Sequence, residues 1–192
     1  KHQLRIFFME VSDLVYILSN SECILYPTDT VWGLGCDATD ELAVDKIYKI
    51  KNRAESKSLI ILVNSIDMLQ QYVEHVPQEA LDLLKEAKRP TTIVYPRPKN
   101  LAQNVVAADN TVAIRIVKHE FCENLIKEFG KPIVSTSANI SGQPTPKSFG
   151  EISQAILDSV DYVVALQQDS ISGISSRILK INLDDTIEVI RE

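Results

Sequence analysis

The chain has 192 residues, which is the length of one ordinary domain. Hydrophobic residues make up 45% of it and charged residues 24%, so the chain can form a core and general disorder is excluded. Its 20 basic and 26 acidic residues leave a net charge of −6. This balance argues against a surface coated with nucleic-acid-binding charge, so any site for a polyanion must be local.

No apolar run approaches the roughly 20 residues that a membrane-spanning helix needs, and the N-terminal residues show no signal-peptide pattern. The three cysteines include no Cys-x-x-Cys pair, and the three histidines have no metal-ligand spacing. We therefore expect a cytoplasmic protein in a reducing compartment, without membrane association, disulfides or a structural zinc site.

Apolar periodicity predicts an alternation of helices and strands. A helix over residues 11–18 is followed by a short buried strand over 23–26, which Pro27 ends, and then by a loop with Gly33 and Gly35. Further helices are predicted over residues 40–50, 65–72, 77–88, 120–129 and 148–157. Further strands are predicted over residues 59–63, 91–95, 111–117, 132–136, 161–165 and 177–183, with a long polar loop over 97–110. This alternation indicates an α/β or α+β domain whose sheet is at least partly parallel.

Short polar side chains follow the first predicted strand, in the segment Tyr26–Gly35. Its two glycines allow a close backbone approach, and Thr28, Asp29 and Thr30 offer hydrogen-bonding groups. The same glycines fit the Gly-x-Gly-x-x-Ala pattern of dinucleotide-binding folds. In that pattern the glycines join a strand directly to a helix, whereas six residues separate the strand from Gly33 here. A dinucleotide site is therefore disfavoured.

A basic cluster lies in residues 46–57, which hold five basic side chains and one acid, Glu55. If the preceding helix ends near residue 50, Lys51 and Arg53 lie two apart on extended chain and point the same way. Lys57 stands just before a buried strand, where the three cations could converge on phosphates. The alternative is a solvated helix end, whose cations are favoured by the helix dipole.

Hydroxyl and amide side chains alternate with other residues from Ser135 to Asn139. On extended chain Ser135, Ser137 and Asn139 share one face, which suits a ribose, a phosphate or the turn that holds it. The alternative is a turn that satisfies its own backbone. No Gly-x-Ser-x-Gly elbow and no His/Asp set accompany these serines, so a nucleophilic triad is not indicated.

Arg115 interrupts the apolar run from Val112 to Val117, and a buried or cleft-lining arginine needs an anionic partner. That partner is either a structural Asp or Glu or a bound anion, and the sequence leaves both open. Ser175 and Ser176 precede another predicted strand and form a second polar neighbourhood of this kind.

Together these segments resemble the YrdC/Sua5/YciO family over nearly the whole chain, from about Val11 to Arg191. Tyr26–Gly35 resembles the family's Pro-Thr-[Asp/Glu]-Thr-x-[Tyr/Trp]-Gly-Leu. Residues 51–59 are similar to its Lys-x-Arg-x-x-x-Lys-Pro-Leu, and residues 137–139 to its Ser-x-Asn. Each motif alone is weak, but three in this order and at this spacing are specific.

The resemblance implies a twisted sheet of parallel and antiparallel strands, flanked by helices around a basic concave cleft. It implies one domain over residues 1–192, without the C-terminal Sua5 domain of longer members. The implied reaction is a nucleotidyl transfer in which L-threonine, bicarbonate and ATP, with Mg²⁺, give threonylcarbamoyl-AMP and pyrophosphate for the t6A modification of tRNA. The implied partners are downstream tRNA threonylcarbamoyl-transfer proteins, with tRNA or double-stranded RNA as a candidate ligand. Such chemistry needs alignment and charge neutralisation rather than a protein nucleophile.

The resemblance also assigns site residues to each ligand. Catalytic roles fall on Lys51, Arg53, Ser137 and Asn139. It implies that L-threonine binds at Thr30, Arg115, Ser135 and Ser175, where Arg115 would bind the carboxylate in a bidentate manner. It implies that ATP binds at Lys51, Arg53, Lys57, Thr111, Ser137, Asn139, Thr145 and Arg191. A metal site built from protein alone is not implied, and Mg²⁺ is expected with ATP near Ser137 and Asn139.

The sequence departs from the family pattern at three places. Arg89 stands where the family has Gly, Ser58 replaces the Pro after the third cation, and Arg177 lies in a strand that reads Ser-Thr-Val-Val in the family. Two alternatives stay open. One is an RNA-binding protein without synthase activity, for which residues 85–99 supply five basic side chains against one acid. The other is a YciO-type paralogue with a different substrate.

Overall fold

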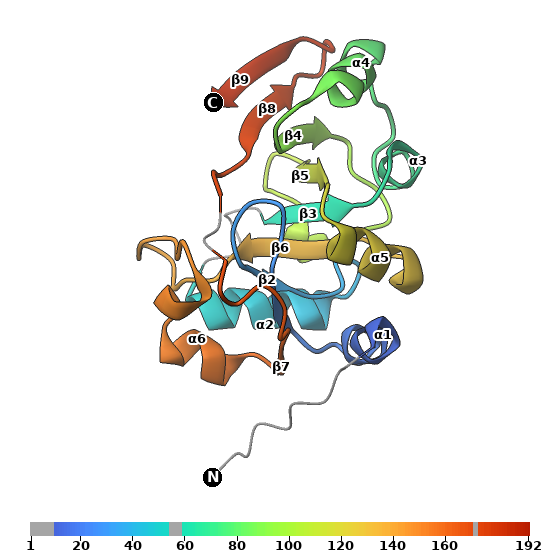
Figure 1. The fold of residues 1–192 in the computed structure, drawn as a ribbon. Coiled ribbons are helices and arrows are strands. Elements are labelled where there is room, and N and C mark those ends of the chain that lie inside the picture. The colour runs from blue at the N-terminus through green and yellow to red at the C-terminus, as the bar shows by residue number, and fades with distance from the viewer. Residues whose placement is uncertain (1–9, 54–58, 171–172) are drawn as a thin grey trace.

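The computed structural model describes residues 10–53, 59–170 and 173–192. In these ranges nine strands form one twisted sheet, in the order β7-β1-β2-β6-β3-β5-β4-β8-β9 (Figure 1). The strands are β1 (Ile24–Tyr26), β2 (Gly33–Gly35), β3 (Ile60–Val63), β4 (Thr91–Pro96), β5 (Thr111–Ile116), β6 (Ile133–Ser137), β7 (Tyr162–Val163), β8 (Arg177–Ile181) and β9 (Ile187–Arg191). The helices are α1 (Val11–Ser19), α2 (Glu41–Lys51), α3 (Ile66–Leu69), α4 (Gln78–Glu86), α5 (Glu120–Phe129) and α6 (Gln154–Ser159), with the 3₁₀ turns η1 (Gln103–Val105) and η2 (Phe149–Glu151).

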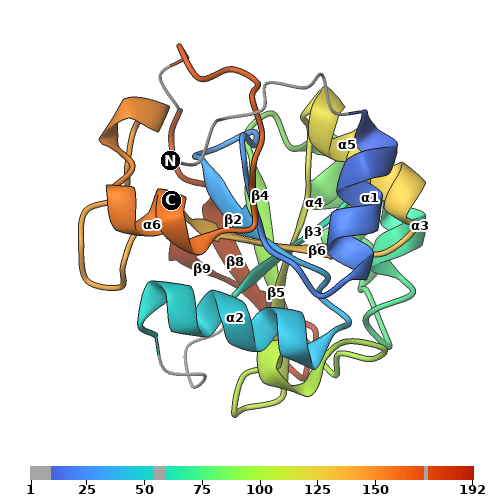
Figure 2. The same ribbon diagram turned by 90° about the horizontal axis from the view of Figure 1, so that it is seen from below.

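The sheet is mixed, as the sequence resemblance implied. β3 runs parallel to β5, β4 to β8 and β1 to β7, whereas the other neighbouring strands are antiparallel. Helices α1 and α5 bury Leu14 and Ile126 in the core on one face, while α2 buries Ala43 and Ile47 in the core on the other (Figure 2). The expected class of a mixed sheet flanked by helices is therefore confirmed. No helix in the described ranges is long and apolar enough to cross a bilayer.

Helix α2 is bounded by two polar residues. Asp40 caps its start, where the carboxylate accepts hydrogen bonds from the N–H groups of Leu42 at 2.9 Å and Ala43 at 3.4 Å. Asn52 ends it in the left-handed conformation, with φ of 50°. The helix therefore includes Lys51, which the sequence analysis placed on extended chain beyond the helix end.

Several other elements differ from the sequence prediction. Neither β2 nor β9 was predicted, and β2 reads Gly-Leu-Gly, a composition that disfavours strands. The helix predicted over 65–72 is the single turn α3, and the one predicted over 148–157 divides into η2 and α6. The predicted loop over 97–110 contains η1 and is anchored to the start of α2, because the Asn104 side-chain amide donates to the Glu41 carbonyl at 3.0 Å.

The glycines of β2 make room for an aromatic ring. The Tyr26 ring lies against Gly33 and Gly35, and its hydroxyl donates to the Val134 carbonyl at 3.0 Å. A Cβ added at Gly35 would overlap the Tyr26 ring and lie 2.9 Å from that same carbonyl. Burial raises the pKa of the Tyr26 hydroxyl well above its usual value, so it stays a donor. The sequence suggested that a ligand could approach the backbone closely at these glycines. At Gly35 the Tyr26 ring takes that place.

We predict that Gly35→Ala lowers the free energy of unfolding by about 1–3 kcal/mol, because the added methyl must displace both the ring and a strand carbonyl. Gly150→Ala is the matched control, since the nearest atom to its added Cβ is Ser148 Oγ at 4.0 Å; its change should stay within about 0.5 kcal/mol. Urea unfolding followed by Trp32 fluorescence measures both. Equal stability of the two variants would contradict the packing described for Tyr26.

Candidate active site

Lys51 joins the basic cluster to the Ser-Ala-Asn motif. Its ammonium donates to the Ser137 carbonyl at 2.6 Å, to the Asn139 carbonyl at 2.8 Å and to Asn139 Oδ1 at 3.2 Å. These acceptors match in number the three N–H donors of an ammonium group. In the reverse direction, the Ser141 N–H donates to the Lys51 carbonyl at 2.8 Å. The C-terminal end of α2 is therefore held against the loop that follows β6.

This lysine is almost wholly sealed from solvent, with 1% of the residue exposed. Burial, with a smaller contribution from the neighbouring positive charge of Arg53, lowers its pKa to about 8. The prediction that Lys51 lies on extended chain beyond the helix is wrong, because α2 continues through this residue and turns its side chain inward. The alternative of a solvated cation at the helix end is also wrong for Lys51. Arg53 follows the helix, is half-buried, and its N–H donates to the Tyr48 carbonyl at 3.0 Å. Lys57, the third predicted cation, lies outside the described residues.

The Ser-Ala-Asn motif forms a bonded loop beside β2. The Ser137 hydroxyl donates to Asn139 Oδ1 at 2.5 Å, and the Asn139 amide nitrogen donates to the Gln143 carbonyl at 2.6 Å. Ser137 pairs with Gly33 in the register of β6 and β2, and the Ala138 N–H donates to the Trp32 carbonyl at 3.2 Å. The first and third motifs, about a hundred residues apart in the chain, therefore lie side by side.

The strand register also gathers the other predicted residues. Paired residues of neighbouring strands share a face of the sheet, as do alternate residues of one strand. Ser135 of β6 and Ala113 of β5 both pair with Ile60 of β3, so their side chains lie on the same face of the sheet. Thr111 and Arg115, two residues before and after Ala113, share that face. Arg115 in turn pairs with Thr92 of β4. Residues from two of the sequence segments, together with Thr92, thus meet on one face of the sheet.

Arg115 has the structural partner that the sequence left open. Its Nη2 lies 3.1 Å from Asp29 Oδ1 and donates to Thr30 Oγ1 at 3.2 Å. The side chains of Arg115 and Asp29 are only 3% and 6% exposed, and the Lys118 N–H donates to the other oxygen of Asp29 at 3.2 Å. Within the described residues, Arg115 Nε has no hydrogen-bond partner. The guanidinium therefore holds the Thr28–Thr30 segment through Nη2 and keeps its Nε–H for a further acceptor.

A small cavity of about 120 Å³ lies beside this segment. It is lined by Thr28 and Thr30 from the loop after β1 and by Ser170 and Gly173 from the segment before β8. The Gly173 N–H donates to the Thr30 carbonyl at 3.0 Å. The cavity thus lies next to the side chain to which Arg115 donates.

The remaining predicted residues lie in different surroundings. The Thr111 hydroxyl is largely buried and donates to Asp109 at 2.6 Å, and Thr145 is exposed in the loop after β6. Ser175 is exposed, whereas its neighbour Ser176 is buried and shares a 2.8 Å hydrogen bond with Thr92. Arg191 donates from Nε and Nη2 to the Ser176 carbonyl at 3.2 and 2.7 Å. Ser176, Thr92 and Asp29 are polar groups of this region that the sequence analysis did not assign. No alternation in the sequence marks Thr92, because it follows Thr91 and precedes Ile93.

Fold and site together define an α/β domain that gathers hydroxyl, amide and cationic groups on one face of a mixed sheet, a class suited to anionic ligands. A family model named Sua5/YciO/YrdC and described as "Telomere recombination" matches residues 16–192, and the chain belongs to this family. The resemblance found in the sequence is therefore confirmed.

Known relatives agree with this assignment. The chain is 35% identical over 157 residues to a threonylcarbamoyl-AMP synthase of Pseudoalteromonas translucida, which covers 80% of this chain and 84% of the relative. A structure of P. abyssi Sua5 with the H234A/Y235A substitutions matches with a TM-score of 0.85 at 28% identity over 94% of this chain and 55% of that one. Another, complexed with L-threonine, matches with a TM-score of 0.81 at 29% identity over 88% and 50%. This chain thus spans about half the length of those Sua5 chains.

We predict that Lys51→Met destabilises the protein by about 1–3 kcal/mol, because the carbonyls of Ser137 and Asn139 lose their donor while staying buried. Lys49→Met is the matched control on the same helix, because the Lys49 side chain is 75% exposed and forms an ion pair only with Asp45; its stability should stay close to that of the unchanged protein. Urea unfolding measures both variants. Hydrogen exchange should also quicken in residues 137–143 of Lys51→Met. A Lys51→Met protein as stable as Lys49→Met would overturn the role given to the ammonium.

Proposed function

We propose that this protein is a threonylcarbamoyl-AMP synthase, which makes threonylcarbamoyl-AMP and pyrophosphate from L-threonine, bicarbonate and ATP. The observation that carries the proposal is the convergence of the Thr30, Arg115 and Ser137 segments on one face of the sheet. The named relative at 35% identity over most of both chains supports it. The complex of P. abyssi Sua5 with L-threonine supports the same substrate here.

The proposed chemistry divides the site into two halves. The threonine amine and bicarbonate form a carbamate with loss of water. A carbamate oxygen then attacks the α-phosphorus of ATP while the bond to the β-phosphate oxygen breaks and pyrophosphate leaves. The protein has to align these reactants and offset negative charge, which are the main contributions in phosphoryl transfer. A nucleophilic side chain is not required.

We assign the amino acid to the Arg115 half of the site. Thr30 and Arg115 are already hydrogen-bonded to each other, and the unpartnered Nε of Arg115 needs an acceptor that a substrate carboxylate would supply. Ser135 lies on the same face of the sheet. Ser175 is carried over from the family resemblance, and the buried Ser176 beside it acts by holding Thr92 and Arg191.

We assign the nucleotide to the Ser137 half of the site. Ser137, Asn139 and Arg53 would contact the phosphates, with Lys57, Thr111, Thr145 and Arg191 at the further positions that the resemblance implies. Lys51 contributes its buried positive charge and holds Ser137 and Asn139 in place, because all three of its N–H groups are already engaged.

Mg²⁺ belongs to the proposal as the companion of ATP. In the described ranges, no group of three or more His, Cys, Asp or Glu side chains is placed to hold a metal ion. The hydroxyl of Ser137 and the amide oxygen of Asn139 are hard oxygen donors, which fit an ion that keeps most of its ligands from phosphate and water. When bound, the ion would neutralise charge on the phosphates.

The cellular setting follows from the product. Threonylcarbamoyl-AMP would pass to cytoplasmic transfer proteins that modify adenosine 37 of tRNA. The alternative of a pure RNA-binding protein relied on the basic window of residues 85–99. In the structure, β4 runs through this window and its six residues, at about 3.3 Å each, place Arg89 and Arg97 about 20 Å apart. Arg97 there lies 3.9 Å from Glu74, so the window forms no continuous basic strip.

The test measures pyrophosphate release with ATP, bicarbonate and Mg²⁺ while L-threonine is varied. We expect release that saturates with threonine. Arg115→Lys should raise the KM for threonine about tenfold or more with unchanged ATP affinity, because a lysine lacks the planar guanidinium and cannot keep the contacts to Asp29 and Thr30 while also replacing the Nε donor. Arg97→Lys, at the far end of β4, should leave both parameters unchanged. Pyrophosphate release that does not depend on threonine, or an Arg115→Lys enzyme with a normal KM, would contradict the proposal.

A further inference from the structure

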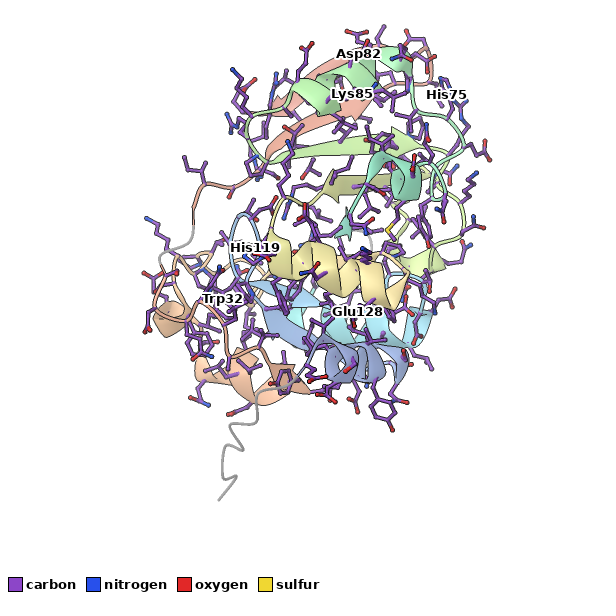
Figure 3. All side chains as sticks on the ribbon, turned by 45° about the vertical axis from the view of Figure 1, so that its right-hand side comes forward. Trp32, His75, Asp82, Lys85, His119 and Glu128 are labelled. Atoms are coloured by element: carbon purple, nitrogen blue, oxygen red, sulfur yellow. The ribbon has the colours of Figure 1, made fainter. Side chains whose placement is uncertain are left out.

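A second cavity, larger than the one beside Thr30, lies across the sheet from Arg115. Its volume is about 290 Å³, and it opens where the end of α4, the start of β4 and the end of β5 meet. Figure 3 shows the α4 side of this region, where Lys85 is labelled on the helix. Three cations line the cavity, namely Lys88, Arg89 and Lys118, with Asp29 on one wall. The basic window of the sequence and a lysine nearly thirty residues later are thus brought to one place.

The cavity faces away from the candidate active site. Ile116 and Thr91 line it, whereas their chain neighbours Arg115 and Thr92 form a cross-strand pair on the opposite face of the sheet. Because successive residues of a strand point to opposite faces, the two sites lie on different sides of β4 and β5. Asp29, which contacts Arg115, lines both this cavity and the smaller one beside Thr30, so the two cavities are neighbours that share this carboxylate.

The charge lining this cavity is positive. Asp29 is already paired with Arg115 at 3.1 Å, so its carboxylate leaves little negative charge for the three cations. Arg89 lies 3.7 Å from Glu192, and both side chains are exposed. An ion pair between exposed side chains contributes little energy. Within the described ranges, Lys88 forms no ion pair. Three like charges around one cavity repel each other, and a bound anion would relieve that repulsion.

The orientation of one cation is fixed. Lys118 Nζ donates to the Ala87 carbonyl at 2.9 Å, which leaves two of its N–H groups for a ligand. That carbonyl lies just past the end of α4, so the bond also offsets the negative end of the helix dipole. The backbone N–H of the same residue holds Asp29. A guanidinium and two ammonium groups around a cavity are the donors by which proteins bind phosphate.

We propose that this cavity is a second anion site, which binds a small phosphate-class anion through Lys88, Arg89 and Lys118. The site rests on this geometry and not on the proposed function. Pyrophosphate, which the proposed reaction releases, is a member of the class and can fill the cavity independently of ATP and threonine.

The experiment is calorimetric titration of the full chain with inorganic pyrophosphate, without nucleotide, threonine or Mg²⁺. Lys88→Ala/Arg89→Ala changes two exposed residues and should weaken binding about tenfold or more, the cost of losing charged hydrogen bonds. Lys85→Ala, on the exposed side of α4 and outside the cavity, should leave the affinity unchanged.

Two results would overturn the proposal: no binding at millimolar pyrophosphate, or equal binding by the double variant. The second result would assign pyrophosphate to the candidate active site alone. Because the titration contains neither ATP nor threonine, its outcome is independent of whether the protein turns over those substrates.

Discussion

The buried ammonium of Lys51 is the interaction on which the candidate active site depends. Placing a positive charge in a protein interior costs several kcal/mol unless hydrogen bonds replace its hydration. Here three oxygens of Ser137 and Asn139 do so, and all of them belong to the segment that the ammonium must position. Since β6 is paired with β2, fixing the end of β6 also fixes the start of β2 at Gly33. One side chain thus links α2, β6 and β2.

The loop between β1 and β2 depends on a second buried charge pair. The loop crosses the face of the sheet that α5 covers, and Cys122 of α5 donates from its thiol to the Pro27 carbonyl at 3.3 Å (Figure 1). Asp29 then pairs with Arg115, and Thr30 accepts from the same guanidinium. Removing one member would leave the other buried and unpaired, which is why such a pair fixes geometry even where it adds little net stability. The loop therefore holds Thr30 at a defined position beside Arg115 of β5.

Much of this arrangement could be predicted from the sequence. The apolar periodicity predicted most strands and helices within a few residues, and the motifs at Thr30, Lys51 and Ser137 led to the family. Their meeting on one face could not be predicted, because it depends on the strand order and register, which are long-range properties. The same limit explains why the cavity cations at 88, 89 and 118 were not seen as one group.

The errors of the prediction have local physical causes. Lys51 was placed on extended chain because the end of a helix cannot be located to one residue from its sequence. A difference of one residue here determines whether the Lys51 side chain points to solvent or into the core. Ser175 stays a prediction for the threonine site. Its neighbour Ser176 is the buried partner of Thr92, because in extended chain one position reverses the face, and the sequence could not show which of the two serines turns inward. The Gly-Leu-Gly strand β2 was missed because its stability comes from two neighbouring strands and the Tyr26 ring and not from its own residues.

The most direct test of the central claim is a crystal structure of the protein with L-threonine, Mg²⁺ and a non-hydrolysable ATP analogue. The account predicts the threonine carboxylate on Arg115 with its side chain near Thr30, and the phosphates beside Ser137 and Asn139. It further predicts that Lys51 keeps its hydrogen bonds to the carbonyls of residues 137 and 139. A nucleotide bound on the other side of β4 and β5, or a Lys51 ammonium that has left those carbonyls, would contradict it.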